Sequence, residues 1–329
     1  MEKIALLMDP GTRAMVLNEK TIRRMERIGE VAINEGGTEP EQVKPLLAGA
    51  TIAVTSWGNR PLDADLLSVC PNLKLLMHAA GSVKPVVSDA LWEKGVRVSS
   101  SAPMLSMGVS ETALGFTIAA SKNFFSLNDS LHRGGWAEGK ENIRELYDLT
   151  VGVVGGGWAG RHYIELLRPF QVEVLLYDPF ISAEKAAEMG AEKADFEDVL
   201  KRSDILSIHA PSIPETFHMF NRETLAKMKK DAVLINTARG SIIDEEALYE
   251  HMAAGNLKYA CLDVFDPEPP AADHPLRTLP NVIMTPHLAG LANNGLKKVG
   301  QHACDEIERL LAGQPLMAEV TRDMLARMA

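Results

Sequence analysis

The chain has 329 residues, enough for two domains at roughly 100–200 residues each. Apolar residues make up 46% and charged residues 24%, as in an ordinary globular protein that buries a core. The formal net charge of -10 argues against a nucleic-acid partner, and no run of about 18 apolar residues predicts a membrane span.

The three cysteines, Cys70, Cys261 and Cys304, lie far apart and form no CxxC pair. The sequence therefore indicates neither a zinc site nor a disulfide framework, and we expect no bound metal. The first ten residues turn polar too soon for a signal peptide. Together these features favour a reduced, cytoplasmic protein.

In the first hundred residues, short apolar runs alternate with helical patterns. We expect strands over 4–8, 51–55, 73–77 and 96–98, and a helix over 21–28, where apolar residues recur at helical spacing. Residues 99–103 are expected to break the last of these strands. Strands that alternate with helices predict a parallel sheet covered on both faces.

A long helical pattern over 107–125 precedes the most apolar strand and is suited to bridge two domains. After it, six buried-strand candidates follow one another at 151–154, 173–177, 205–208, 232–235, 259–262 and 282–284. Six such strands in succession are typical of a doubly wound nucleotide-binding sheet. A final helix over 296–311 is expected to end before Gly313 and Pro315.

The segment Gly155-Gly156-Gly157-Trp158-Ala159-Gly160 fits the pattern G-x-G-x-x-G between a predicted strand and a predicted helix. In such a turn Gly155 permits the sharp bend, Gly157 lets backbone N–H groups approach a pyrophosphate, and Gly160 lets helix and strand pack closely. The phosphates then lie at a helix N-terminus, where unpaired N–H groups favour anions. Alone, the motif is weak evidence, because glycine-rich turns are common.

The next predicted strand ends in Tyr177-Asp178-Pro179, about 20 residues further on. An acidic side chain at this place binds the ribose hydroxyls of NAD and repels the additional phosphate of NADP. Asp178 therefore favours NAD, and its alternative interpretation is a solvated strand end before a proline turn.

Reactive side chains follow three later strands, as Arg239, Glu268 and His287. Because ligands bind at the carboxyl ends of parallel strands, the three side chains are placed to converge. Taken singly, each has an ordinary alternative: a surface ion pair for Arg239, an exposed loop for Glu268 and a helix cap for His287.

The glycine motif, Asp178 and the segments around Arg239, Glu268 and His287 together resemble the D-2-hydroxyacid dehydrogenase family. The matching segments are VGVVGGGWAGR, LLYDP, HAPSIPET, MKKDAVLINTARGSIIDEEAL, CLDVFDPEP and TPHLAG, in the family's order, and they cover about 104–290. The resemblance implies an NAD-dependent enzyme that transfers a hydride between nicotinamide and a small 2-keto or 2-hydroxy acid. It implies that Arg239 holds the substrate carboxylate, that His287 is the acid and base, and that Glu268 orients the histidine.

The resemblance also implies further contacts. Asp263 is expected to accept from the nicotinamide carboxamide, and Ala80, Gly81 and Ser82 to form the substrate loop. The remaining cofactor contacts that it implies are Trp158, Ala159, Pro211, Thr216, Thr237, Ala238 and Gly290. Trp158 departs from the basic or polar residue usual there, and Trp57 is equally compatible with lining the substrate pocket and with core packing.

The family's chain path predicts an α/β protein of two doubly wound parallel-sheet domains. A discontinuous flavodoxin-like substrate domain would comprise 1–103 and 291–329, and a Rossmann NAD-binding domain 104–290. A homodimer is expected by the same resemblance. Two other functions stay open at this point: an NAD(H)-sensing, corepressor-like protein, and oxidation of a non-carbon anion such as phosphite.

Overall fold

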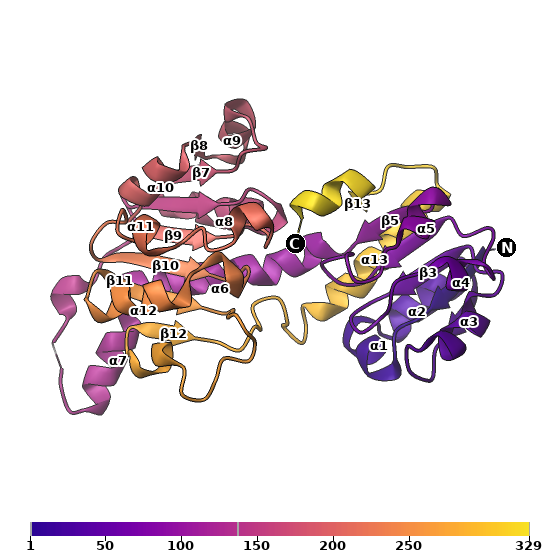
Figure 1. Ribbon diagram of the computed structural model, residues 1–329, viewed down its shortest axis with the longest axis horizontal. Coiled ribbons are helices and arrows are strands. Elements are labelled where there is room, and N and C mark those ends of the chain that lie inside the picture. Colours follow the sequence, from indigo (N-terminus) through magenta and orange to yellow (C-terminus); the bar gives the residue numbers. More distant parts are fainter. Residues whose placement is uncertain (1, 137, 329) are drawn as a thin grey trace. The chain divides into compact units, whose positions relative to one another are not determined.

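The computed structural model describes residues 2–136 and 138–328, which form two compact units (Figure 1). One unit comprises the chain up to Leu105 together with the chain from Leu291 onward, and the other is Ser106–Gly290. Each is built on one β-sheet with helices packed against it. No helix within the described residues is both long and apolar enough to cross a membrane.

The discontinuous unit contains a six-stranded sheet in the order β13-β5-β4-β3-β1-β2. Without β13 this is the order 2-1-3-4-5, that of flavodoxin-like folds. The strands are β1 (Glu2–Leu6), β2 (Gly29–Ile33), β3 (Ile52–Thr55), β4 (Leu75–His78), β5 (Arg97–Ser100) and β13 (Glu319–Val320). All pairs are parallel except β13 with β5, which is antiparallel, so the predicted parallel sheet carries one antiparallel edge strand.

Successive residues of these strands alternate between two hydrophobic clusters. On β1, Ala5 belongs to one cluster, and Ile4 and Leu6 belong to the other. Because alternate side chains of a strand point to opposite faces, both faces of the sheet are covered. The covering helices are α1 (Pro10–Val16), α2 (Glu19–Glu26), α3 (Pro40–Leu47), α4 (Ala64–Leu67), α5 (Asp89–Glu93) and α13 (Leu296–Leu311).

The second unit contains a seven-stranded, all-parallel sheet in the order β12-β11-β10-β9-β6-β7-β8. Counted from β6, this is the dinucleotide-binding order 3-2-1-4-5-6 with a seventh strand added. The strands are β6 (Thr150–Val154), β7 (Glu173–Tyr177), β8 (Glu192–Lys193), β9 (Ile205–Ile208), β10 (Ala232–Asn236), β11 (Leu257–Leu262) and β12 (Val282–Met284). The order changes direction between β6 and β9, the place where such sheets bind ligands.

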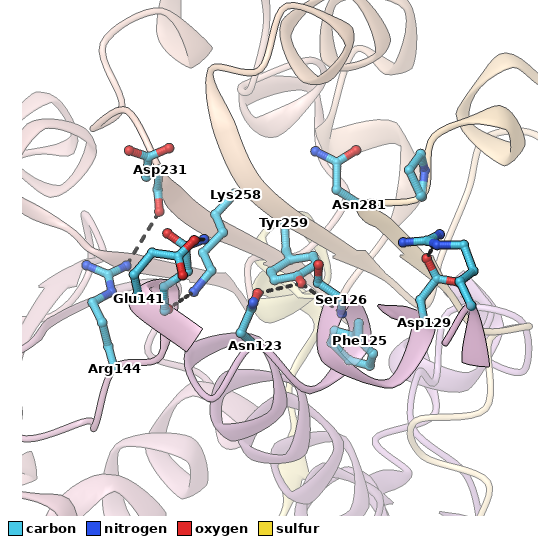
Figure 2. Close-up of a pocket in the computed structure, with 13 residues that line it drawn as sticks. Asn123, Phe125, Ser126, Asp129, Glu141, Arg144, Asp231, Lys258, Tyr259 and Asn281 are labelled. Carbon is cyan, nitrogen blue, oxygen red and sulfur yellow. Dashed lines mark hydrogen bonds and ion pairs between the residues drawn. The ribbon is translucent and has the colours of Figure 1, made fainter. Parts of the chain in front are cut away.

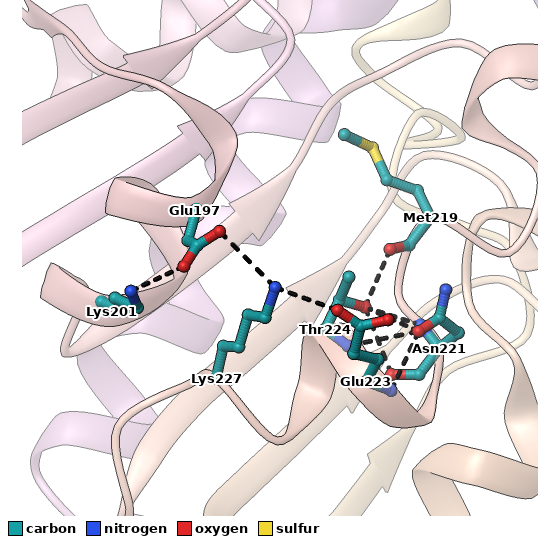
Figure 3. A network of polar contacts seen from close by, with 7 residues as sticks. All are labelled: Glu197, Lys201, Met219, Asn221, Glu223, Thr224 and Lys227. Atoms are coloured by element: carbon teal, nitrogen blue, oxygen red, sulfur yellow. Dashed lines mark hydrogen bonds and ion pairs between the residues drawn. The ribbon is translucent and has the colours of Figure 1, made fainter.

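Helices flank both faces of this sheet. They are α6 (Ala102–Ser121), α7 (Phe124–His132), α8 (Trp158–Leu167), α9 (Ala183–Met189), α10 (Phe196–Arg202), α11 (Arg222–Leu225) and α12 (Glu245–Ala253). A polar network fixes the short α11: Asn221 caps its first turn, and Lys227 bridges Glu223 to Glu197 of α10 (Figure 3).

The region between the fifth strand and the long helix differs from expectation. Residues 99–103 were predicted to break the strand, but β5 continues through Ser100 and α6 already begins at Ala102. The strand continues because β4 lies beside it and the buried Ser99 hydroxyl donates to Glu306, 2.5 Å away. The helix expected over 107–125 is also interrupted, since Asn123 adopts a left-handed conformation with φ 56° before α7.

Candidate functional site

The glycine motif forms a tight turn between β6 and α8. Gly155 has φ 99°, and a Cβ there would lie 2.7 Å from the backbone nitrogen of Ala210, so both conformation and space require glycine. A Cβ on Gly160 would lie 2.0 Å from the carbonyl oxygen of Gly155, which keeps helix and strand in close contact. Gly157, by contrast, is exposed at the start of α8, and its Cβ would meet nothing within 4 Å.

Asp178 follows β7 and closes this turn from the neighbouring strand. One carboxylate oxygen accepts from the N–H of Gly156 at 2.8 Å, and the other accepts from the N–H of Phe180 at 2.8 Å. A carboxylate offers about four lone-pair sites, so acceptor capacity is left for hydroxyl groups of a ligand. Asp178 therefore lies beside the helix N-terminus that the glycines create.

The other predicted contacts with a cofactor lie on the same unit. Trp158 and Ala159 begin α8, half-buried, and the Ala159 carbonyl accepts from Ser110 of α6 at 2.8 Å. Pro211 and Thr216 belong to the loop after β9, where the Thr216 hydroxyl donates to the Pro211 carbonyl at 2.6 Å. Gly290 packs against α6, because a Cβ added to Gly108 of that helix would lie 3.7 Å from the Cα of Gly290.

The turn after β10 carries Arg239. Asn236 shapes it, because its side chain accepts from the N–H of Ala238 at 3.0 Å and donates to the carbonyl of Arg239 at 2.9 Å. Thr237 is buried, and its hydroxyl has no partner among the described residues. Asn236 was not among the predicted site residues, although an asparagine at a strand end before a turn is the available signal.

His287 is held in an unusual backbone conformation by Asp263. Its φ is 49°, a region that non-glycine residues rarely adopt, and its N–H donates to the Asp263 carbonyl at 2.8 Å. The fully buried Asp263 carboxylate accepts from the Thr285 hydroxyl and from the N–H groups of Leu288 and Ala289, at 2.5, 3.0 and 2.9 Å. Asp263 thus fixes the loop before and after His287, a function that the sequence analysis did not anticipate.

Glu268 and His287 form the most direct contact of the site. The Nδ1 atom of His287 lies 2.7 Å from Oε2 of Glu268, and Oε1 of Glu268 accepts from the N–H of Phe265 at 3.0 Å. The histidine side chain is 49% exposed, so the ring is accessible from outside this unit.

Arg239 lies close enough to Glu268 for the two charges to interact. Burial lowers the pKa of the Arg239 guanidinium, and the negative charge of Glu268 opposes that change. An arginine remains protonated despite such shifts. At the carboxyl ends of β10, β11 and β12 the structure therefore places Arg239 near Glu268, and Glu268 in contact with the accessible His287.

The predicted substrate residues lie on the other unit, at the carboxyl ends of its strands. Trp57 follows β3 and is partly buried against the core cluster that contains Ile4 and Val54. Ala80 is buried, and Gly81 and Ser82 are half-buried. His78 is buried just before this loop, bonded to the Thr55 hydroxyl at 3.0 Å and to the backbone of Ser82. Burial lowers the pKa of His78 to about 4, so it is neutral near pH 7.

A pocket of about 840 Å³ lies at the opposite, amino-terminal edge of the seven-stranded sheet (Figure 2). Its lining includes Asn123, Arg144, Lys258, Tyr259 and Asn281, and none of the predicted site residues. Residues 2–136 and 138–328 contain no group of three histidine, cysteine or acidic side chains placed to bind a metal.

Comparison with known proteins identifies the family of the chain. Residues 114–289 match the family model of the D-isomer specific 2-hydroxyacid dehydrogenase, NAD binding domain. A D-3-phosphoglycerate dehydrogenase of Methanocaldococcus jannaschii is 36% identical over 91% of this chain and 56% of its own length. A hydroxypyruvate reductase of Thermotoga maritima is 30% identical over 84% of this chain and 90% of its own length.

Among solved structures, a phosphoglycerate oxidoreductase from Rhizobium etli has the same fold, with a TM-score of 0.84 at 22% identity. That match covers 98% of this chain and 99% of the other. The chain spans about half the length of the first D-3-phosphoglycerate dehydrogenases that it matches, from 48% to 57%. By its family model, its relatives and its fold, the chain belongs to the D-isomer specific 2-hydroxyacid dehydrogenase family and carries that family's NAD-binding domain.

Proposed function

We propose that the chain is an NAD-dependent dehydrogenase that interconverts a small 2-keto acid and the D isomer of its 2-hydroxy acid. The observation that carries the proposal is the 2.7 Å contact between His287 and Glu268, with Arg239 on the adjacent strand end. A cation beside an oriented acid–base group is the arrangement that reduction of a 2-keto acid requires.

The residues present fit a dinucleotide. The exposed N-terminus of α8 at Gly157 suits a pyrophosphate, because a helix N-terminus offers unpaired N–H groups and a positive dipole end. Asp178 retains acceptor capacity for ribose hydroxyls and disfavours a 2′-phosphate. The buried Thr237 hydroxyl, which has no partner among the described residues, supports a contact at the nicotinamide end. Asp263 is fully buried and already accepts three hydrogen bonds, so its proposed contact with the carboxamide rests on the one remaining lone pair.

In the direction of reduction, bound NADH supplies the hydride that C2 of the keto acid receives. Arg239 binds the substrate carboxylate through charge-assisted hydrogen bonds and so orients the carbonyl. His287 donates a proton from Nε2 to the carbonyl oxygen and takes it back in the reverse direction. Glu268 holds the ring through Nδ1 and leaves Nε2 for the proton transfer.

In this proposal one unit binds the cofactor and the other recognises the substrate. Residues 104–290 bind the cofactor, with further contacts from Trp158, Ala159, Pro211, Thr216, Ala238 and Gly290. The discontinuous unit recognises the substrate, and the backbone N–H groups of Ala80–Ser82 are suited to a carboxylate. Trp57 offers an apolar side chain near the end of β3 and packs, partly buried, against the core of this unit.

We further propose a cytoplasmic homodimer. Large apolar side chains are exposed within one short stretch of the cofactor unit: Phe124, Leu131, Trp136, Ile143 and Tyr147. A surface of this kind is typical of a protein–protein contact, and symmetric dimers are the commonest oligomers. The three cysteines are buried free thiols, which suits a reducing compartment.

The test is NADH consumption, followed by absorbance, with a panel of 2-keto acids of increasing side-chain size. Steady turnover that Arg239→Ala abolishes supports the dehydrogenase and limits the size of its substrate. If the unmodified chain binds NADH but turns over no 2-keto acid, the proposed activity is wrong, and an NAD(H)-sensing function is favoured instead.

A further inference from the structure

A second glutamate–histidine pair lies next to the first on the same unit. The Nε2 atom of His274 is 2.9 Å from Oε2 of Glu245, and the two side chains are only 18% and 13% exposed. Burial raises the pKa of the Glu245 carboxyl, while its contacts with the Asp266 N–H and with His274 oppose that change. Neither residue contacts the Arg239, Glu268 and His287 side chains in the hydrogen bonds described above.

The second pair is linked to the first through two consecutive backbone N–H groups. The N–H of Phe265 donates to Oε1 of Glu268 at 3.0 Å, and the next N–H, of Asp266, donates to Oε1 of Glu245 at 3.0 Å. Both glutamates thus use one oxygen to hold the same loop and the other to hold a histidine. The loop between Phe265 and Glu268 is therefore fixed from both sides.

The position of Glu245 at the start of α12 does not by itself explain this arrangement. An acidic residue in a first helical turn is stabilised by the helix dipole while exposed to solvent, as Glu246 is. The cap of α12 is already provided by Asp244, whose side chain accepts from the N–H of Ala247 at 3.1 Å. Removing a carboxylate from water costs free energy unless hydrogen-bond partners compensate for it. The Asp266 N–H and His274 are the partners that compensate for the shielding of Glu245.

We propose that the half-buried Glu245–His274 pair is a positioning element that sets the loop carrying Glu268, and through it the orientation of His287. The contact with Glu245 is the only one that the ring nitrogens of His274 make in the described part of the chain, since Nδ1 is buried and meets no partner. The ring therefore serves to fix the Glu245 carboxylate. Glu245 then fixes Asp266, two residues before Glu268. This inference rests on the roles proposed for Glu268 and His287.

Three substitutions separate positioning from charge and from helix stability. Glu245→Asp keeps the charge and the acidic first turn, but its shorter side chain cannot reach both Asp266 and His274. Glu245→Gln keeps the length and can still accept from Asp266 and donate to His274. Glu246→Asp is the matched control on the exposed neighbour.

The expected result is a loss in kcat with cofactor binding unchanged. A displacement of about 1 Å in a catalytic group costs up to roughly 100-fold, so Glu245→Asp should lower kcat about 10- to 100-fold. The Kd for NADH should stay within about threefold, and Glu245→Gln and Glu246→Asp should stay within about threefold in kcat. If Glu245→Asp fails to fold, His274→Asn replaces it, with the same expected loss in kcat.

A second readout does not depend on turnover. In protein labelled with ¹⁵N-histidine, the Nδ1 resonance of His287 in Glu245→Asp should move toward its position in Glu268→Ala. An unmoved resonance, a kcat retained in Glu245→Asp, or an equal loss in Glu245→Gln would overturn the inference. Absence of turnover in the unmodified chain would contradict the proposed activity instead, and the resonance would still decide the inference.

Discussion

The backbone of Gly240 lies against that of Phe265, so that a Cβ on Gly240 would stand 2.0 Å from the Phe265 carbonyl carbon. This contact joins the turn that carries Arg239 to the loop that carries Glu268. The two segments come from neighbouring strands, β10 and β11. The spacing between the guanidinium and the acid–base pair is therefore set by a backbone contact that only glycine permits.

Gly240→Ala should therefore lower both the stability of the fold and the catalytic rate. Overpacking of this kind costs about 1–3 kcal/mol in the free energy of unfolding, because backbone atoms must move. Urea unfolding measures the loss, with Gly115→Ala as a control whose Cβ meets nothing within 4 Å. A Gly240→Ala protein as stable and active as the control would show that the contact is looser than described.

Replacement of the histidine should affect the chemical step. His287→Ala should lower kcat by roughly 100- to 10,000-fold, the span usual for a general acid, while NADH binding persists. Stopped-flow measurement of a single turnover, with NADH affinity measured separately, tests this expectation. A loss below about tenfold would remove His287 from the proposed role.

Even a conservative change of the arginine should weaken activity, although less than its removal. Arg239→Lys keeps the charge but loses the planar pair of donors, so one charge-assisted hydrogen bond to the substrate is lost. At about 1.5–3 kcal/mol for such a bond, kcat/KM should fall roughly 10- to 100-fold. The KM for the 2-keto acid and the Kd for NADH are the quantities to compare. Weakened NADH binding with an unchanged substrate KM would place Arg239 at the cofactor instead.

The choice of cofactor should depend on Asp178. Asp178→Ala should weaken NADH far more than NADPH, because the carboxylate is proposed to bind the ribose hydroxyls of one and repel the 2′-phosphate of the other. Fluorescence titration with both cofactors measures the two affinities. Equal weakening would mean that Asp178 acts only through its bonds to Gly156 and Phe180.

The stability of the discontinuous unit should depend on pH through His78. Burial lowers its pKa from 6.5 to about 4, so the unfolded chain binds the proton more tightly. The stability contributed by neutral His78 is present above about pH 6.5 and is lost as pH falls toward 4. Between pH 7 and pH 5 this loss amounts to about 2 kcal/mol.

His78→Gln should remove this part of the pH dependence, since glutamine does not titrate. Urea unfolding at the two pH values measures it, and His132→Gln, at an exposed histidine, is the control. An undiminished pH dependence in His78→Gln would assign the titration to other groups.

The fold was predictable where strands are buried on both faces. The expected bounds of β7, β9 and β12, and of helix α13, are confirmed, and α8 begins after the glycine motif as expected. The missed strands lack such a signal. The edge strand β2 is half-exposed, β8 and β13 have two residues each, and β13 depends on distant contacts such as the Arg97–Glu319 ion pair at 2.6 Å.

For the site, the motifs placed the reactive residues at strand ends but did not reveal how they are supported. Nothing local indicates that Asp263 binds the loop around His287, or that Glu245 and His274 meet across 29 positions of the sequence. These contacts arise from strand order and from packing between loops. The roles of Arg239, Glu268 and His287 themselves stay predictions.

The most direct test of the proposed activity is transfer of deuterium from [4,4-²H₂]NADH, labelled at both C4 positions, to a 2-keto acid, with the product analysed by NMR. We expect deuterium at C2 of a D-2-hydroxy acid, formed roughly 100- to 10,000-fold more slowly with His287→Ala. A product without deuterium at C2, or labelling that persists undiminished in His287→Ala, would contradict this expectation.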